Sequence, residues 1–358
     1  MTKKILLIGG TGVIGESIVE YLSSSDHSIY VTTRQKRQSF DNVQYIVGNG
    51  KDDEFLKEII LKFEFDAIID FMHYSTQDFE RKLPYLLDEK RQYIFLSSVR
   101  IYDDVDLIVE ESQRITEGVK DEDYLNSNEY AIEKIAQENL LKKFPRKFWT
   151  IVRPSITFGR GRFQLGTFEA DIILNRASYN LPVCLPPEIL NRKTTMTRGA
   201  DTAKLISSLL FNHAAFGNDF NVLTDESITW REVAEVYEEV LGLECKEVTL
   251  ADYMKIEGNK WQVKYDRVFD RVCDNTKALN QVPLNNRSLC EVRQGLRAEL
   301  LSLTATEIGS TISRKNGHID KVLGIYRLPR GNYTLKSLIL YLCGRFDFLD
   351  SVFLKIKG

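Results

Sequence analysis

The sequence predicts an α/β fold in which a doubly wound parallel sheet is followed by a smaller lobe and a helical tail. Short apolar runs alternate with amphipathic segments over residues 1–153, the pattern of a parallel sheet covered by helices. A glycine-rich turn joins the first apolar run to the first amphipathic segment. Hydrophobic residues make up 43% of the chain and charged residues 28%, as in an average globular protein.

The strands are expected where short apolar runs are bounded by polar or glycine residues. Six such runs predict strands at residues 4–8, 29–33, 43–47, 67–71, 93–97 and 148–152. Apolar residues at helical spacing predict helices at residues 14–22, 54–63, 79–87 and 126–143. Parallel strands with helices on both faces form a Rossmann-type sheet.

The pattern changes after Arg153. Residues 181–187 contain three prolines and cannot form a regular helix. Two helices and a strand are expected further on, at residues 200–211, 229–241 and 220–223. We therefore expect a smaller lobe, residues 154–300, over the C-terminal edge of the sheet, where open parallel sheets bind ligands. Some of its segments are expected to return to the first domain, and residues 301–358 to add a helical extension.

Composition and charge exclude several classes of protein. Lys and Arg total 48 and Asp and Glu total 51, so the net charge of −3 gives no long-range attraction to nucleic acid. No run approaches the ~20 apolar residues that span a bilayer, and the N-terminal run is too short for a signal peptide. Five scattered cysteines and four isolated histidines suggest neither disulfides nor a metal site. A cytoplasmic protein is expected.

The glycine-rich turn predicts a dinucleotide site. It follows the first predicted strand and opens the first predicted helix. Glycine permits a tight turn and a close approach of the backbone to a pyrophosphate, and the N-terminus of the helix attracts negative charge. Residues 1–153 are therefore expected to form a dinucleotide-binding domain, with the cofactor held at Gly9, Thr11, Gly12, Val13, Ile14 and Gly15.

The end of the second predicted strand bears on the choice of cofactor. An NAD site usually has Asp or Glu here to bind the ribose 2′-hydroxyl, but the first acid downstream is Asp41. Arg34 and Arg37 follow the strand instead, and a guanidinium suits a 2′-phosphate. The sequence therefore favours NADP over NAD, with a solvated basic loop as the alternative.

Tyr130 is the only tyrosine that is followed four residues later by a lysine, Lys134. Residues at this spacing share one helix face, so the ammonium can lower the pKa of the phenol and let it act as a base near neutral pH. A chain with 16 tyrosines can contain such a pair by chance. A serine at the end of the fifth predicted strand, Ser97 or Ser98, is expected to face the same crevice as the glycine turn.

The order of these motifs resembles that of the extended short-chain dehydrogenase/reductase family, in particular its NAD(P)-dependent epimerase/dehydratase branch. The glycine turn, a strand-end serine and Tyr-x-x-x-Lys occur in that order. Similar family segments occur at residues 152–159, 197–203 and 274–277. The likeness covers residues 3–300.

The resemblance implies roles for individual residues. Tyr130 is the general acid/base, and Lys134 binds the nicotinamide ribose and lowers the pKa of Tyr130. Ser98, chosen over Ser97 by its spacing from Tyr102, binds the same substrate oxygen. A family Gly-Asp near the adenine is here Gly48-Asn49, so the resemblance places Asn49 at that contact.

The resemblance also implies a nucleotide-activated sugar as substrate. Dehydratases of the family carry Thr-Asp-Glu where this chain has Ser98-Val99-Arg100, and without those carboxylates a 4,6-dehydration lacks its acid/base pair. Ketoreduction and epimerisation through a 4-keto species remain, and the sequence names neither the sugar nor the nucleotide. A non-catalytic NAD(P)-binding member that regulates partners or binds RNA is the alternative.

The extension leaves two further interpretations open. Its apolar side chains, among them Phe346, Phe348 and Leu349, can pack on the substrate lobe or on a second subunit of a homodimer. Basic residues beside them, such as Lys336 and Arg345, also suit peripheral contact with an anionic membrane surface. Packing within the protein is the favoured interpretation.

Overall fold

A computed structural model describes residues 2–303, 312–327 and 333–357. The chain forms two compact units, each made of several segments. The first unit contains Met1–Thr157, Thr195–Ser227 and Arg271–Cys290, and the second contains Phe158–Thr194, Ile228–Asp270 and Glu291–Gly358. The chain therefore leaves the first unit and returns to it twice.

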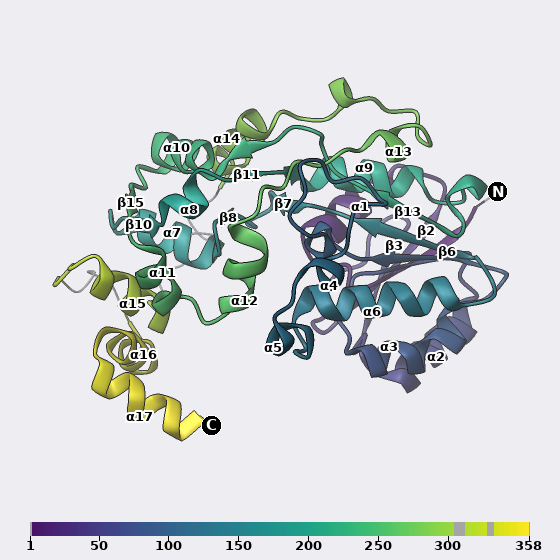
Figure 1. Ribbon diagram of the computed structural model, residues 1–358. Helices are drawn as coiled ribbons and strands as arrows, with labels where there is room; N and C mark the ends of the chain where they lie inside the picture. Colours follow the sequence, from purple (N-terminus) through teal and green to yellow (C-terminus); the bar gives the residue numbers. More distant parts are fainter. Residues whose placement is uncertain (1, 304–311, 328–332, 358) are drawn as a thin grey trace. The chain divides into compact units, whose positions relative to one another are not determined.

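A seven-stranded parallel sheet forms the centre of the first unit (Figure 1). Its strands are β1 (Lys4–Ile8), β2 (Ser28–Thr33), β3 (Val43–Val47), β4 (Ala67–Asp70), β5 (Gln92–Leu96), β6 (Trp149–Arg153) and β13 (Asn218–Asn221). Their order is β13-β6-β5-β4-β1-β2-β3, so the direction of winding reverses between β1 and β4. Open parallel sheets bind ligands at such a reversal, outside the carboxyl ends of the strands.

Helices cover both faces of this sheet (Figure 1). One face packs against α1 (Val13–Ser23) and α9 (Gly199–Ser208). The other packs against α2 (Asp53–Phe63), α3 (Thr76–Leu86) and α6 (Tyr130–Lys143). The strands are buried on both faces, which explains why they read as continuous apolar runs. The predicted doubly wound Rossmann-type fold is confirmed.

Two elements differ from the sequence prediction. The helix expected at residues 126–143 begins only at Tyr130, because Glu129 has an extended backbone and its side chain accepts the N–H of Ala131. Such an N-cap marks the N-terminal limit of a helix. The chain before it forms the separate short helix α5 (Glu122–Leu125). The strand expected near residue 220 is β13, the seventh strand of the main sheet.

The second unit is built from helices and short two-stranded sheets. Its larger helices are α7 (Ala170–Ser178), α10 (Trp230–Leu241), α11 (Leu250–Ile256) and α14 (Val292–Leu301). Its paired strands are β8 (Gln164–Leu165) with β9 (Phe168–Glu169), β10 (Val183–Leu185) with β15 (Cys245–Glu247), and β11 (Lys193–Thr194) with β14 (Ile228–Thr229).

The remaining elements are short. They are the helices α4 (Ile115–Gly118), α8 (Pro187–Leu190), α12 (Lys260–Gln262) and α13 (Thr276–Leu279), the strands β7 (Ile156–Phe158) and β12 (Met196–Arg198), a π-helical turn (Val263–Arg267), and 3-10 turns at Val99–Ile101, His213–Ala215 and Asn286–Ser288.

The predicted helical extension is present and forms part of the second unit. It contains α15 (Arg314–Val322), α16 (Leu335–Arg345) and α17 (Asp347–Lys357). Arg176 of α7 donates to Asp320 of α15 at 2.7 Å, and both side chains are fully buried. The Tyr341 hydroxyl of α16 donates to the second oxygen of Asp320 at 2.7 Å. The extension is thus joined to the lobe by a buried ion pair and not by apolar contacts alone.

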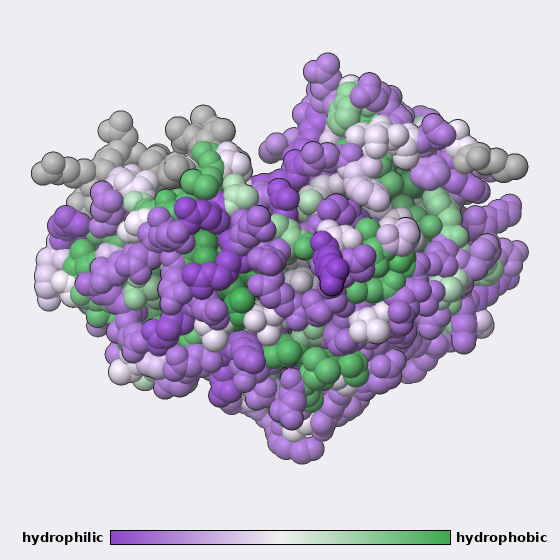
Figure 2. Space-filling view, turned by 90° about the horizontal axis from the view of Figure 1, so that it is seen from above, coloured by the Kyte–Doolittle hydropathy of each residue, from purple (hydrophilic) through white to green (hydrophobic). Residues whose placement is uncertain are grey.

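Large apolar side chains remain exposed on the extension, at Leu335, Ile339, Phe346, Phe348 and Leu349. The face of the protein seen in Figure 2 is mainly hydrophilic, and its hydrophobic residues lie in separate patches. Within the described residues, no helix combines the length and the apolar character that crossing a membrane requires.

The ion pair between Arg176 and Asp320 generates the first prediction. Asp320→Asn leaves a buried guanidinium without its counter-charge, and we expect the free energy of unfolding to fall by about 3–5 kcal/mol. The double variant Arg176→Met, Asp320→Leu removes both charges and should lose less stability than the single variant. Urea denaturation of the full chain measures both. Equal losses in the two variants would show that charge pairing does not hold the extension in place.

Candidate functional site

The glycine-rich turn lies between β1 and α1, where Gly9 has a φ of +72°. The N–H of Gly9 donates to Thr32 Oγ1 at 2.8 Å, and the N–H of Thr11 donates to the carbonyl of Gly9 at 2.9 Å. A Cβ on Gly15 would lie 2.5 Å from the carbonyl oxygen of Gly10, so only glycine allows α1 to begin this close to the turn.

Gly12 is the N-cap of α1, and as a glycine it has no side chain that could cap the helix. A Cβ on Gly12 would meet no atom within 4 Å. Val13 and Ile14 follow with buried side chains, so only their backbone can serve a ligand. The start of α1 therefore offers open space and N–H groups, and it fits the pyrophosphate of a dinucleotide.

A cleft of about 520 Å³ lies beside this turn. It is lined by Gly9, Thr11, Thr32, Thr33, Arg34, Gly48, Asn49, Gly50, Lys51, Phe71, Met72 and His73. These residues lie at or just beyond the carboxyl ends of β1 to β4. Sequence reasoning named Gly9, Thr11, Arg34 and Asn49 but missed Lys51 and His73. The signal that could have found them is their position after the third and fourth strands.

The two arginines after β2 lie in different surroundings. Arg34 lines the cleft. Arg37 donates to Glu16 of α1 at 2.7 Å and lies 5.8 Å from the ring centroid of Tyr45, and it does not line the cleft. The structure thus brings only Arg34 to the position expected for a ribose contact.

Tyr130 and Lys134 occupy the first two turns of α6. The Lys134 side chain is buried, and its Nζ donates to the carbonyl of Leu96 at 2.7 Å. This Nζ lies 5.8 Å from the ring centroid of Tyr130. Burial lowers the pKa of Lys134 to about 8, although the charges of Asp70 and Glu138 oppose the shift.

Ser98 lies just beyond β5 and caps the turn Val99–Ile101, where its Oγ accepts the N–H of Arg100 at 3.2 Å. Lys134 binds the last carbonyl of the same strand. Ser98 and Lys134 are thus both tied to the carboxyl end of β5.

The ring of Tyr130 has neighbours from two other segments. His73 stacks against it with 5.4 Å between ring centroids, and the guanidinium of Arg100 lies 5.2 Å from the same centroid. His73 also lines the cleft, so Tyr130 contacts one of the residues of its lining.

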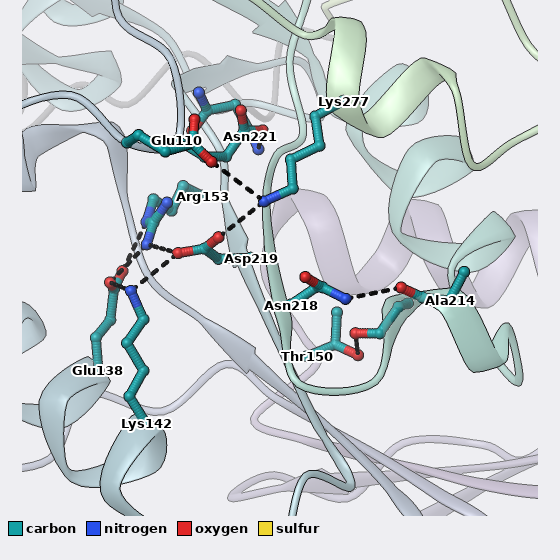
Figure 3. Close-up of polar contacts among 12 residues, drawn as sticks. Glu110, Glu138, Lys142, Thr150, Arg153, Ala214, Asn218, Asp219, Asn221 and Lys277 are labelled. Atoms are coloured by element: carbon teal, nitrogen blue, oxygen red, sulfur yellow. Dashed lines mark hydrogen bonds and ion pairs between the residues drawn. The ribbon is translucent and has the colours of Figure 1, made fainter.

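A buried ionic network anchors α6 to the sheet (Figure 3). Arg153 of β6 donates to both carboxylate oxygens of Glu138 in α6, at 2.8 and 2.7 Å. It also donates to Asp219 of β13 at 2.6 Å. Lys142 and Lys277 reach the same Asp219 at 3.0 and 3.1 Å. Glu138 is one turn beyond Lys134, so the network fixes the part of the helix that carries the lysine.

The network keeps its carboxylates ionised. Burial opposes the charge of Glu138, but the guanidinium of Arg153 prevails and lowers the pKa of Glu138. Burial likewise opposes the charge of Asp219, but Arg153 and Lys142 hold the pKa of Asp219 well below its usual value. The buried Arg153 therefore has two anionic partners from different elements.

Residues 5–178 match the sequence model of the NAD dependent epimerase/dehydratase family. Over this range, just under half of its length, the chain is similar to that family. The epimerase/dehydratase region contains the glycine turn, the cleft, Tyr130 and Lys134. The expected branch of the short-chain dehydrogenase/reductase family is confirmed.

Two solved structures share the fold of this chain. UDP-glucose 4-epimerase from Thermus thermophilus in complex with NAD is 18% identical with a TM-score of 0.60, covering 83% of this chain and 97% of that one. A human epimerase family protein with NADPH is 13% identical with a TM-score of 0.62, covering 84% of this chain and 100% of that one.

One curated relative has a different description. The chloroplast stem-loop binding protein of 41 kDa b from Arabidopsis thaliana is 23% identical over 248 residues. The match covers 65% of this chain and 62% of the relative. The chain thus spans less than two thirds of that relative's length.

The Asp219 carboxylate generates the second prediction. Its folded-state pKa is lowered, so its contribution to stability is present above its unfolded pKa of about 4 and is lost as the pH falls below that value. We expect Asp219→Asn to be less stable than the wild type at neutral pH, and the two to converge in acid. Urea denaturation between about pH 6 and pH 3 measures this, with the exposed Asp106→Asn as control. Parallel curves for Asp219→Asn and the wild type would contradict it.

Proposed function

We propose that the protein is an NAD(P)-dependent oxidoreductase that acts on a nucleotide-activated sugar, by ketoreduction or by epimerisation through a 4-keto species. The observation that carries the proposal is that Tyr130, with the buried Lys134 one turn away, stacks against His73, which lines the cleft beside the glycine turn. A tyrosine held beside a buried cation can exchange a proton with a sugar hydroxyl or ketone.

Each residue has a distinct task in this proposal. Gly9, Thr11, Gly12 and Gly15 hold the pyrophosphate, with the backbone of Val13 and Ile14, and Asn49, which lines the cleft, contacts the adenine. Lys134 holds the ribose, Ser98 binds the reacting sugar oxygen, and Tyr130 gives or takes the proton on that oxygen. The nicotinamide, when bound, accepts or supplies the hydride.

The turn after β5 argues against 4,6-dehydration. In the dehydratase pattern two carboxylates follow the strand-end hydroxyl, but here Val99 and Arg100 occupy those positions. Val99 is buried, and Arg100 is a cation. Neither side chain can exchange protons with sugar carbons near neutral pH, so hydride transfer is left as the main chemistry.

RNA binding is the second candidate function, and it is favoured by the name of the Arabidopsis relative. The net charge of −3 gives no general attraction to RNA. Titration of labelled stem-loop RNA against the protein, with and without NADPH, separates the two. Micromolar or tighter RNA binding in moderate salt, together with no turnover of any 4-keto sugar nucleotide, would favour the RNA-binding function.

Tyr130→Phe is the third prediction. The substitution removes the proton-transfer hydroxyl and keeps the ring, so we expect kcat to fall by roughly 10²–10⁴. Turnover of 4-keto sugar nucleotides measures this, and NADPH binding should be retained. Tyr21→Phe, on the exposed face of α1, is the matched control. Undiminished turnover in Tyr130→Phe would remove Tyr130 from the mechanism.

Cofactor preference is the fourth prediction. We propose that Arg34 binds the 2′-phosphate of NADP, so NADPH should bind at least several-fold more tightly than NADH. Arg34→Ala should abolish that preference, a loss of about 1–3 kcal/mol for a charge-assisted contact. Arg37→Ala serves as the matched control, because that guanidinium is paired with Glu16 outside the cleft. If the wild type binds both cofactors equally, the preference for NADP is wrong.

A further inference from the structure

Arg100 is a cation held over the ring of Tyr130. It belongs to the turn Val99–Ile101, whose backbone is fixed by the Ser98 Oγ that accepts the N–H of Arg100. The guanidinium carbon lies 5.2 Å from the ring centroid of Tyr130. Lys134 Nζ lies 5.8 Å from the same centroid, so Tyr130 has two cations at similar distances, from two different elements.

Glu129 holds Arg100 in this position. The Arg100 guanidinium donates to the Glu129 carboxylate, and Glu129 is buried and directly precedes Tyr130. The other oxygen of Glu129 accepts the N–H of Ala131 at 2.7 Å and so caps α6. One carboxylate therefore fixes both the start of the tyrosine-bearing helix and the arginine above its ring.

His73 is another titratable neighbour of Tyr130, but its electrostatic effect on the ring is weak. His73 stacks on the ring, but burial and the charges of Lys134 and Lys51 lower the pKa of His73. His73 is therefore neutral over the pH range in which a phenol ionises. Glu133, on the next turn of α6, also acts on His73, and its carboxylate accepts the hydroxyl of Thr76 at 2.5 Å. Arg100 and Lys134 are thus cations beside the ring of Tyr130, and Glu129 is the anion that contacts Arg100.

We infer that Arg100 and Glu129 together set the protonation range of Tyr130, with Arg100 as a positioning residue that stabilises the tyrosinate and Glu129 as the counter-charge that limits its effect. A cation within ~6 Å favours the ionised phenol, and an anion beside that cation reduces the effect. The inference rests on the proposed function, because it assigns a purpose to the ionisation of Tyr130.

The pair also has a role for specificity of reaction. Arg100 occupies the place where a dehydratase of the family carries a proton-transferring carboxylate. A guanidinium cannot exchange a proton near neutral pH. The same position therefore changes from a second acid/base group to an electrostatic support for the first, as a simple hydride-transfer reaction requires.

The test measures the titration of Tyr130 without substrate. Protein labelled with ¹³C at the tyrosine ζ carbon is titrated by NMR, and the resonance absent from Tyr130→Phe identifies Tyr130. Three variants are compared with the wild type: Arg100→Gln, Arg100→Lys and Glu129→Gln. Glutamine at position 129 keeps a carbonyl oxygen that can cap α6, so that variant removes charge with little change in shape. Arg81→Gln, on an exposed part of α3, removes a distant charge as control.

The inference predicts the direction in which each variant shifts the pKa of Tyr130. Arg100→Gln should raise the pKa of Tyr130 by about one unit, Arg100→Lys should restore it, and Glu129→Gln should lower it. Arg81→Gln should leave it unchanged. If Arg100→Gln and Glu129→Gln shift the pKa of Tyr130 in the same direction, or not at all, the pair is only a structural brace and the inference is overturned.

The same variants separate this inference from the proposed function. In each variant, the pH profile of kcat, measured with a substrate that the protein turns over, should shift in the same direction as the pKa of Tyr130 in the NMR titration. If the titration follows the expected order but Tyr130→Phe keeps full turnover, the electrostatic inference holds and the proposed function fails. If Tyr130→Phe is inactive but the titration does not respond to Arg100 or Glu129, the inference alone fails.

Discussion

The buried ion pairs of Arg153 are the constraint on which the first unit depends. This guanidinium joins Glu138 of α6, Asp219 of β13 and the hydroxyl of Tyr102 beyond β5. Burying one charge without partners would cost several kcal/mol, so the three elements must meet at this point for the unit to fold. A helix packed on apolar contacts alone could slide along the sheet, whereas a bidentate ion pair fixes its register.

The fixed register of α6 determines where Lys134 and Tyr130 lie. Lys134 lies one turn before Glu138 and can therefore reach only the end of β5, where its Nζ meets the carbonyl of Leu96. Tyr130 lies one further turn back and stacks against His73, which lines the cleft. Burial of Lys134 lowers its pKa to about 8. The lysine beside the tyrosine therefore titrates closer to neutral pH than an exposed lysine does. The same geometry therefore sets both the anchoring of α6 and the position of Tyr130, the proposed acid/base group.

Local patterns in the sequence were enough to predict the strands of the sheet and the glycine-rich turn. Strands such as Lys4–Ile8 are continuous apolar runs because both faces are buried, and the glycines mark a turn that only glycine can make. Features that depend on long-range contacts could not be predicted from such local patterns. The start of α6 at Tyr130 depends on the cap by Glu129, and the place of β13 in the main sheet depends on a chain return that no local signal marks. Arg34 and Arg37 look equivalent in sequence, and only the pairing with Glu16 separates them.

The turn after β5 explains how one fold can serve different reactions. Its backbone is fixed at both ends, by the Ser98 cap and by Tyr102, whose hydroxyl donates to Asn221 and accepts from Arg153. Of the three residues between them, Val99 and Arg100 lie beyond the strand and are not part of the sheet. With carboxylates there, the turn can move protons on carbon; with Val99 and Arg100 it can only pack and support charge. The same anchored frame that fixes Tyr130 therefore leaves the neighbouring positions free to select the reaction.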